Sequence, residues 1–192
     1  PKAIHAHPCS IASSQHDLPN ISFIIRELGD YTRNLANLTV GQQVYIDGPY
    51  GSISLNDSNK AKGIMLIAGG AGLGPMLSLL RGLAAKHDAR PIRLIYGNTR
   101  LEQMVLLDEI QALEQTMADF KLQLVCLETT QQENIYHGVI DQQCIAENID
   151  LADAKNWAVY LCGPKPMISA VTKNLKTLHI PTSNVYYEQL SF

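Results

Sequence analysis

The feature that most constrains the fold is a glycine cluster that joins a short apolar run to an amphipathic helix, within residues 63–86. Residues 64–68 have the length and composition of a strand buried on both faces. The glycines that follow are Gly69, Gly70, Gly72 and Gly74. Without Cβ atoms they permit a tight turn whose amides can approach a phosphate, and Pro75, which replaces the third glycine of the usual fingerprint, suits the first helical position. The stretch predicts a nucleotide-binding loop, with a plain strand-to-helix turn as the structural alternative.

Composition narrows the classes of protein. The chain has 192 residues and is 46% hydrophobic, which is enough for a buried core in one large or two small domains. A net charge of -3 gives no polyanion-binding footprint, so nucleic acid is not expected as a partner. The four cysteines are far apart and show no CxxC spacing, so we expect free thiols and no metal. No apolar run is long enough to span a bilayer, and we expect the chain as given to be soluble.

Beyond residue 62 the pattern alternates between strands and helices. Strands are expected near 64–68, 92–97, 121–127, 157–162 and 184–189. Helices are expected near 75–86, 104–115, 141–147 and 165–178. This alternation is typical of an α/β fold with a doubly wound parallel sheet, whose ligands bind at the carboxyl ends of the strands.

The first part of the chain is predicted to contain β structure instead. Strands are expected over 10–13, 21–26 and 43–47, with a turn at 48–51. These few strands cannot close a barrel, so they predict a partial antiparallel β-barrel that needs further strands upstream or a partner. The polar stretch 56–62 is the predicted linker, which divides the chain into domains 1–58 and 59–192.

Two further strand ends carry candidate binding residues. The second strand ends at Asn98, Thr99 and Arg100, where an NAD-specific site would usually place a carboxylate. Amide, hydroxyl and guanidinium groups suit a 2′-phosphate instead, although Arg100 as a solvated loop charge is the alternative. The fourth strand of this region ends at Cys162, beside a Gly-Pro turn, and a buried cysteine is most often only a small hydrophobe.

Taken together, these motifs resemble those of a known family. In the second half they are GGAGLGP, YGNTR, LLDEI, YLCGPKPM and YYEQLSF, and in the first half HPCSIASS, FIIRELGDYT and GPYG. The set resembles the flavin- and NADP-binding module of the ferredoxin reductase superfamily. Its His-Pro signature is similar to the version found in ferric reductase and NADPH oxidase type flavocytochromes.

The resemblance implies roles for individual residues, with FAD and NADP as cofactors and NAD as the alternative nucleotide. The implied flavin contacts are His7, Pro8, Cys9, Ser10, Gly29, Tyr31, Thr32 and Phe192. The implied nucleotide contacts are Gly69, Gly70, Gly72, Gly74, Pro75, Asn98, Thr99, Arg100, Cys162, Gly163, Pro164 and Met167. The implied catalytic residues are Cys162 beside the nicotinamide, Ser10 near the redox-active edge of the flavin, and Glu188. Cys9 departs from the family, which usually stacks an aromatic ring on the flavin there.

The function implied is hydride transfer from NADPH to FAD, followed by single-electron transfer to haem or another acceptor. In the ferric reductase type a haem-bearing transmembrane domain lies upstream, which would place the module at the cytoplasmic face of a membrane. Two alternatives stay open. One is a soluble NADH-dependent reductase component that serves a ferredoxin-type partner, and the other is a nucleotide-binding module that has lost its flavin.

Overall fold

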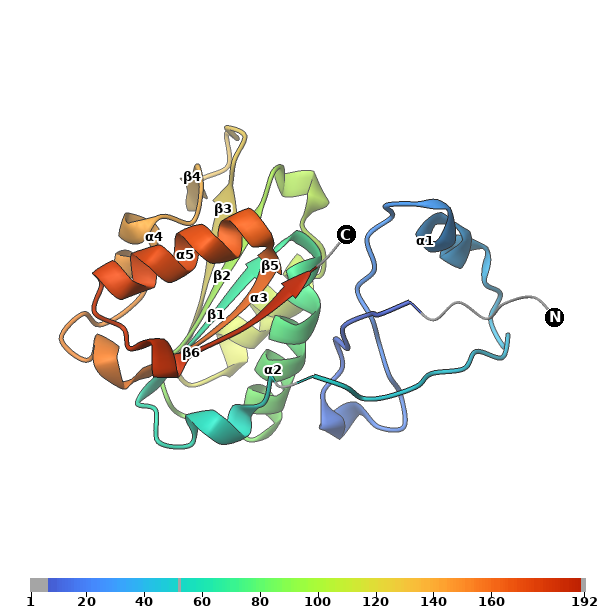
Figure 1. Cartoon of the computed structure of the whole chain (residues 1–192), viewed down its shortest axis with the longest axis horizontal. Helices are drawn as coiled ribbons and strands as arrows, with labels where there is room; N and C mark the ends of the chain where they lie inside the picture. Colours follow the sequence, from blue (N-terminus) through green and yellow to red (C-terminus); the bar gives the residue numbers. More distant parts are fainter. Residues whose placement is uncertain (1–6, 52, 191–192) are drawn as a thin grey trace.

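The computed structural model describes residues 7–51 and 53–190, and its centre is a six-stranded sheet (Figure 1). The strands are β1 (Gly63–Gly69), β2 (Ile92–Asn98), β3 (Phe120–Cys126), β4 (Ile135–His137), β5 (Trp157–Pro164) and β6 (Val185–Leu190). They follow the order β4-β3-β2-β1-β5-β6, and all neighbouring pairs are parallel. The strand order therefore reverses between β1 and β5, and such a switch point opens a crevice at the carboxyl ends of the strands.

Helices cover both faces of the sheet. They are α2 (Leu73–Ala85), α3 (Leu107–Thr116), α4 (Gln142–Glu147) and α5 (Lys165–Thr177). One apolar cluster joins alternate sheet residues such as Leu66 to α2 and α3, and a second joins residues such as Ile67 to α4 and α5 (Figure 1). The predicted doubly wound α/β fold is confirmed.

The central strand explains why this fold can be predicted from an apolar run. All seven residues of β1 are buried, because α2 covers one face and α5 the other. A strand buried on both faces has no polar positions to alternate with, so it reads as a continuous apolar stretch. The five strands and four helices predicted after residue 62 are all present.

Two details of this region differ from expectation. The short strand β4 was not predicted, because three residues are too few to carry a periodic pattern. Pro75 occupies the third position of α2, since a 3-10 turn over Gly70–Gly72 precedes Leu73. It still belongs to the first turn, where a backbone N–H has no partner within the helix.

The first part of the chain does not form the predicted strands. Among the described residues before β1 there is one isolated antiparallel bridge, between Ile11 and Phe23, and a short helix α1 (Asp30–Asn34). The segments 10–13, 21–26 and 43–47 therefore form no ladder, and that prediction is wrong for this structure. A strand needs a neighbour to bond its amides and carbonyls, and apolar side chains such as Val40, Tyr45 and Tyr50 are left exposed. The division into domains after residue 58 stays a prediction.

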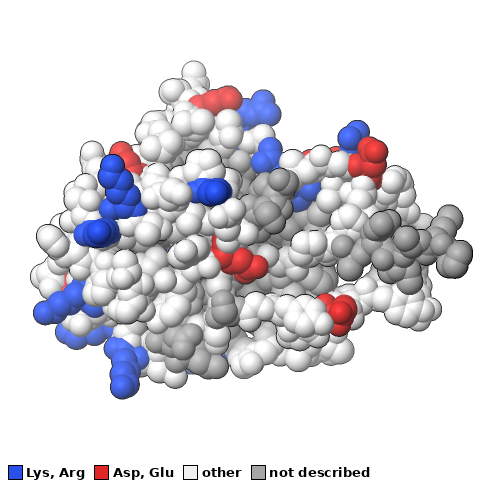
Figure 2. All heavy atoms as spheres, in the orientation of Figure 1, with Lys and Arg blue, Asp and Glu red and all other residues white. Residues whose placement is uncertain are grey.

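The charged side chains are dispersed over the surface. In Figure 2 the lysines and arginines of this face lie mainly over the half that contains the sheet, separated by uncharged surface. Among residues 7–51 and 53–190, no helix combines the length and the hydropathy that crossing a bilayer requires.

Two hydrogen-bonding residues fasten the segment before β1 to the sheet. The hydroxyl of Tyr160 in β5 donates to the carbonyl of Ser54 at 2.9 Å. Nη1 of Arg90 donates to the carbonyls of Ser58 and Ala61 at 2.6 and 3.2 Å, while Nη2 binds the Asp88 carboxylate at 2.6 Å. Arg90 thus ties the connection into β1 to the loop that leads into β2.

The Asp88–Arg90 pair predicts a pH-dependent contribution to stability. Hydrogen bonding from Arg90 lowers the pKa of Asp88 below its ordinary value of 3.8. The unfolded carboxyl therefore binds its proton more tightly than the folded one, so the stabilisation is full above pH 3.8 and is lost as the pH falls through the folded pKa. We expect Asp88→Asn to lower the free energy of unfolding at neutral pH by about 1–2 kcal/mol, with the difference shrinking in strong acid.

Denaturant unfolding of both proteins at neutral and acidic pH measures this effect. Glu133→Gln, on an exposed loop, is the control and should leave the stability unchanged. If Asp88→Asn lowers the free energy of unfolding by the same amount at all pH values, the proposed contribution of the Asp88–Arg90 pair is wrong.

Candidate functional site

The candidate site lies at the switch point, where β1 and β5 end side by side. β1 leads through the turn Gly70–Gly72 into α2, and β5 leads directly into α5. Gly70 has a φ of +55°, which favours glycine, and a Cβ at this position would meet nothing within 4 Å. The turn at Gly70 is therefore open toward its surroundings.

Other glycines of the loop are required by close packing. A Cβ at Gly72 would overlap the backbone carbonyl of Cys162, and a Cβ at Gly69 or Gly163 would overlap the side chain of Met167. The loop, the end of β5 and the start of α5 therefore fit together only because these positions lack side chains. Gly69 and Gly72 must therefore be glycines because a side chain would not fit, whereas Gly70 and Ala71 remain available to a ligand.

A pocket of about 200 Å³ opens beside Gly70. Its walls come from the carboxyl edge of the sheet on one side and from the first part of the chain on the other. The lining residues are Ile24, Ile25, Arg26, Gly70, Ala71, Tyr96, Asn98, Gln103 and Val105. An exposed arginine, glycine-loop backbone and amide side chains are groups that bind phosphates and riboses, so the pocket fits a nucleotide.

Seven of these nine lining residues were not among the predicted site residues, and Arg26 and Tyr96 are two of them. Arg26 belongs to the FIIRELGDYT motif, and its charge within an apolar strand-like run was the available signal. Tyr96 is buried, and its hydroxyl accepts a hydrogen bond from the Val105 amide at 3.3 Å. Burial raises the pKa of Tyr96, so its hydroxyl stays protonated at neutral pH.

Asn98, the last residue of β2, orders the loop that follows this strand through side-chain hydrogen bonds. The Asn98 side-chain amide donates to the Gln103 carbonyl at 3.0 Å, and its oxygen accepts from the Thr99 amide at 2.9 Å. Thr99 and Arg100 are exposed at the tip of this loop. The structure therefore gives Asn98 a positioning role and leaves the Arg100 guanidinium accessible to a phosphate.

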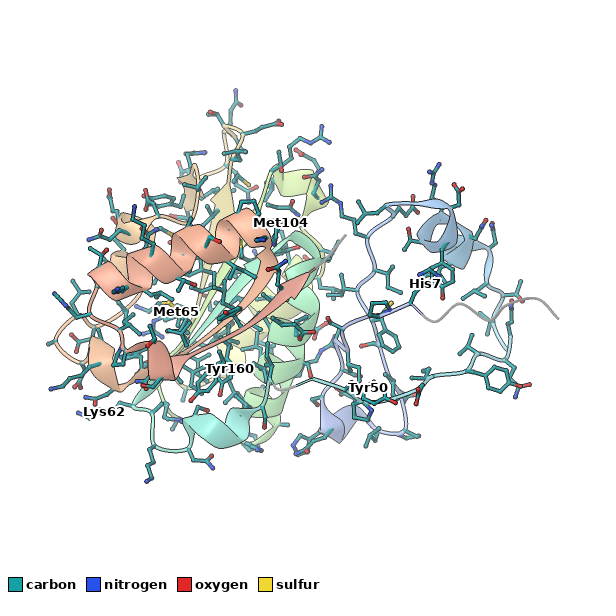
Figure 3. All side chains as sticks on the ribbon, viewed as in Figure 1. His7, Tyr50, Lys62, Met65, Met104 and Tyr160 are labelled. Carbon is teal, nitrogen blue, oxygen red and sulfur yellow. The ribbon has the colours of Figure 1, made fainter. Side chains whose placement is uncertain are left out.

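The motif HPCSIASS (residues 7–14), called the flavin signature below, contacts the motif FIIRELGDYT (residues 23–32). The rings of His7 and Tyr31 stack with their centroids 3.5 Å apart. Figure 3 labels His7 in this part of the chain. The Thr32 hydroxyl accepts from the amides of Leu28 and Gly29 at 2.9 and 3.1 Å, which closes the turn before α1. The structure thus brings together the implied flavin contacts His7, Tyr31, Gly29 and Thr32. His7, Pro8, Cys9 and Tyr31 are all exposed.

Two of the three implied catalytic residues, Ser10 and Cys162, lie at the start of α2. The carbonyl of Ser10 is 3.5 Å from where a Cβ at Gly74 would be, and the carbonyl of Cys162 adjoins Gly72. Glu188 of β6 is the register partner of Cys162. Ser10 and Cys162 therefore flank the first turn of α2, although they come from distant parts of the chain.

The chemistry open to Cys162 is limited by its burial. The side chain is fully buried, and burial together with the charge of Glu188 raises the pKa of the thiol to about 12. At neutral pH it is neither a nucleophile nor a base, so any contribution to a reaction comes from its size and shape. Among the residues outside positions 1–6, 52, 191 and 192, no group of three or more His, Cys, Asp or Glu side chains could hold a metal ion. Phe192 lies outside the described residues.

Comparison with known proteins supports a nucleotide site at this position. The family described as "Oxidoreductase NAD-binding domain" matches residues 66–173. The reductase component of propane 2-monooxygenase from Mycolicibacterium smegmatis is 31% identical over 189 residues, which are 95% of this chain and 53% of that protein. The toluate 1,2-dioxygenase electron transfer component from Pseudomonas putida is 30% identical over 185 residues, with 95% and 53% covered.

A solved structure has a similar fold. The cytochrome b5 reductase domain of Ulva prolifera nitrate reductase superposes with a TM-score of 0.76 at 25% identity, and the match covers 83% of this chain and 64% of that one. The chain spans about half the length of the curated relatives it matches.

The packing of Gly72 predicts the effect of a single methyl group. In Gly72→Ala the new Cβ meets the backbone of Cys162, so the loop must move, and we expect a loss of about 1–3 kcal/mol of stability together with weaker NADPH binding. Gly82→Ala is the matched control. Gly82 lies in the interior of α2, and a Cβ at this position would lie 3.8 Å from the nearest atom, Cδ1 of Leu55. Gly82→Ala should stabilise the protein by about 0.5–1 kcal/mol and leave binding unchanged.

Thermal unfolding and titration calorimetry with NADPH measure both effects. Equal behaviour of the two variants would contradict the close approach of the loop to β5.

Proposed function

The chain belongs to the oxidoreductase NAD-binding domain family, and from this premise we propose that it is the reductase component of an oxygenase system. Bound FAD would supply the chemistry of hydride acceptance from NAD(P)H and of one-electron release to a ferredoxin-type or oxygenase partner. The residues of this chain would bind and orient the two cofactors and exclude water from the space between the cofactors.

The observation that carries the proposal is that the flavin signature lies beside the glycine loop. Ser10 approaches Gly74 at the start of α2, and Ile24–Arg26 form the wall of the pocket opposite Gly70 and Ala71. Residues of the FIIRELGDYT motif and of the glycine loop therefore line one pocket. Hydride transfer requires such an arrangement, because the donor and acceptor atoms must come into contact.

The nucleotide is assigned to residues that the structure leaves accessible. The open backbone at Gly70 and Ala71 would hold the pyrophosphate, with Arg26 as the nearby cation. Thr99 and Arg100 would bind a 2′-phosphate, which makes NADPH the proposed donor and NADH the alternative. The pKa of Tyr96 keeps its hydroxyl protonated in the same pocket.

The flavin is assigned to the motif residues of the first part of the chain. Gly29 has open space where a Cβ would be, and the stacked rings of His7 and Tyr31 lie close to the same turn. These features fit a flavin nucleotide. The exposed thiol at Cys9 offers little surface for stacking on the ring, which makes the flavin affinity the quantity to measure.

The relatives favour the reductase-component alternative over the ferric reductase expectation. Both compared enzymes are described as the reductase or electron transfer component of an oxygenase. Nothing in these matches supports a haem-bearing transmembrane partner. We therefore propose an oxygenase or ferredoxin-type protein as the electron acceptor.

Reconstitution with FAD tests the proposed function. The protein is incubated with FAD and desalted, and NADPH is then added without oxygen while the flavin absorption band is followed. We expect the band to be retained after desalting and to bleach with NADPH. A protein that binds NADPH and retains no FAD would be a nucleotide-binding module that has lost its flavin, which would overturn the proposal.

Arg100 tests the preference for NADPH. Loss of one charge-assisted contact to phosphate costs about 1.5–3 kcal/mol. Arg100→Ala should therefore weaken NADPH binding by about tenfold or more and leave NADH binding nearly unchanged. Titration calorimetry with both nucleotides measures this, with Arg33→Ala on the exposed face of α1 as the control. Equal losses for both nucleotides would exclude a role in 2′-phosphate recognition.

Cys162 tests the proposed packing against the nicotinamide. Cys162→Ser changes little in volume, so stability should fall by about 1–3 kcal/mol while flavin reduction in stopped-flow slows by a larger factor. Cys144→Ser is the matched control, because Cys144 is also fully buried but belongs to the cluster on the opposite face of the sheet. An unaffected reduction rate in Cys162→Ser would show that the thiol is only part of the core.

A further inference from the structure

One arginine connects α2 to the segment that carries the flavin signature. Arg81 binds the Glu109 carboxylate of α3 with two hydrogen bonds, from Nε at 2.7 Å and from Nη2 at 2.8 Å. Its remaining terminal nitrogen, Nη1, donates to the carbonyl of Ala12 at 2.8 Å and to the hydroxyl of Ser22 at 3.2 Å. The Arg81 side chain is 21% exposed, so its bonds to Glu109 and Ala12 are partly buried, whereas the bond to Ser22 is exposed to solvent.

The same face of α2 makes two further contacts with this segment. The hydroxyl of Ser78 donates to the carbonyl of Ser13 at 2.7 Å. Gly74 lies against the carbonyl of Ser10. Positions 74, 78 and 81 are spaced i, i+4 and i+7, which places them on one face of a helix.

The segment that α2 holds has little other support. Ala12, Ser13 and Ser14 are buried, whereas most of the residues from 15 to 51 are exposed. Within the segment, the Ala12 amide donates to the Ser22 carbonyl at 2.8 Å and the Ser22 amide to the Ser13 hydroxyl at 3.0 Å. Arg81 therefore reaches both arms of the only small antiparallel pairing found in the described part before β1.

We propose that Arg81 and Glu109 form a clamp that fixes residues 10–14 along α2 and so sets the position of the flavin relative to the glycine loop. The flavin part of this inference rests on the proposed function. Arg81 is a positioning residue, since it contacts the signature segment rather than a cofactor. Arg81 lies outside the motifs of the sequence analysis, and Glu109 belongs to the LLDEI motif, to which no role was assigned there.

The geometry explains why an arginine and a carboxylate are both needed. Glu109 takes two donors in the fork-to-fork arrangement, which orients the guanidinium and leaves Nη1 directed at Ala12. A lysine presents one compact ammonium group and cannot bind the carboxylate at two atoms and the carbonyl at the same time. A glutamine at position 109 would keep the shape but weaken the hold on the guanidinium.

Hydrogen exchange tests the clamp without any cofactor. In Arg81→Met we expect the amides of Ala12 and Ser22 to exchange at least about tenfold faster, because the carbonyl and hydroxyl that Arg81 holds are released. Amides of β1 should exchange as in the unaltered protein. Glu109→Gln and Arg81→Lys should show smaller changes in the same direction.

Cofactor binding gives a second readout. In Arg81→Met the Kd for FAD should rise by about tenfold or more, while the Kd for NADPH stays within about twofold, because the glycine loop is untouched. A residue needed only for general stability would not separate the two cofactors. If the unaltered protein retains no FAD, the proposed function fails, but the exchange of Ala12 and Ser22 still decides whether the clamp exists.

The control is Arg93→Met. Arg93 also binds a carboxylate, that of Asp119 at 2.8 Å, but within the sheet and far from the signature segment in the fold. It should change neither the exchange of Ala12 and Ser22 nor the ratio of the two Kd values. If Arg93→Met has the same effect as Arg81→Met, the clamp is refuted.

A second variant keeps the test decisive if Arg81→Met loses its fold. Ser78→Ala removes the neighbouring contact to Ser13 and leaves the ion pair intact. If both Ser78→Ala and Glu109→Gln leave the exchange of Ala12 and Ser22 unchanged, α2 does not hold the segment and the proposal is overturned.

Discussion

The structure depends on the approach of the glycine loop to the end of β5. At Gly72 the loop lies so close to the Cys162 carbonyl that no Cβ fits, and Met167 fills the space above Gly69 and Gly163. The switch point of a doubly wound sheet is where a ligand crevice forms, and here the two halves of the sheet meet at contact distance. The loop is therefore held by packing, before any ligand is bound.

From this contact α2 takes its position, and the first part of the chain takes its position from α2. The helix begins at the loop and presents Gly74, Ser78 and Arg81 to the segment that carries the flavin signature. That segment has no ladder of its own and leaves apolar side chains exposed, so its order derives from the helix. The two halves of the proposed cofactor site are thus positioned by one element, and a shift of α2 would move both.

The strands and helices of the nucleotide-binding half could be predicted from the sequence because the signals for them lie close together along the chain. Strands buried on both faces read as apolar runs, and the glycine, helix and turn signals that follow each strand come within a few residues. In the first part the apolar patterns were right for strands, but a strand forms only against a partner, and a pattern does not show whether the partner is there. The predicted strands over 21–26 and 43–47 failed for this reason.

Contacts between distant parts of the chain could not be predicted, for a related reason: Met167 was predicted only as a nucleotide contact, and Arg81 was assigned no role. The role of Met167 in closing over Gly69 joins two strand ends that are far apart in sequence, and Arg81 binds Ala12 across 69 residues. In the sequence pattern Arg81 lies off the apolar face of its helix. Only the folded chain shows that this face is covered by another segment.

In the proposed function the nicotinamide and the flavin meet at the start of α2. The most direct measurement is the absorption spectrum of the FAD-loaded protein after reduction and addition of NADP⁺, because a reduced flavin and an oxidised nicotinamide give a long-wavelength charge-transfer band only when their rings stack. We expect this band to appear with a stoichiometry of one nucleotide per flavin. Nucleotide binding without the band, in a protein that retains its flavin, would show that the two cofactors do not meet and would contradict the account.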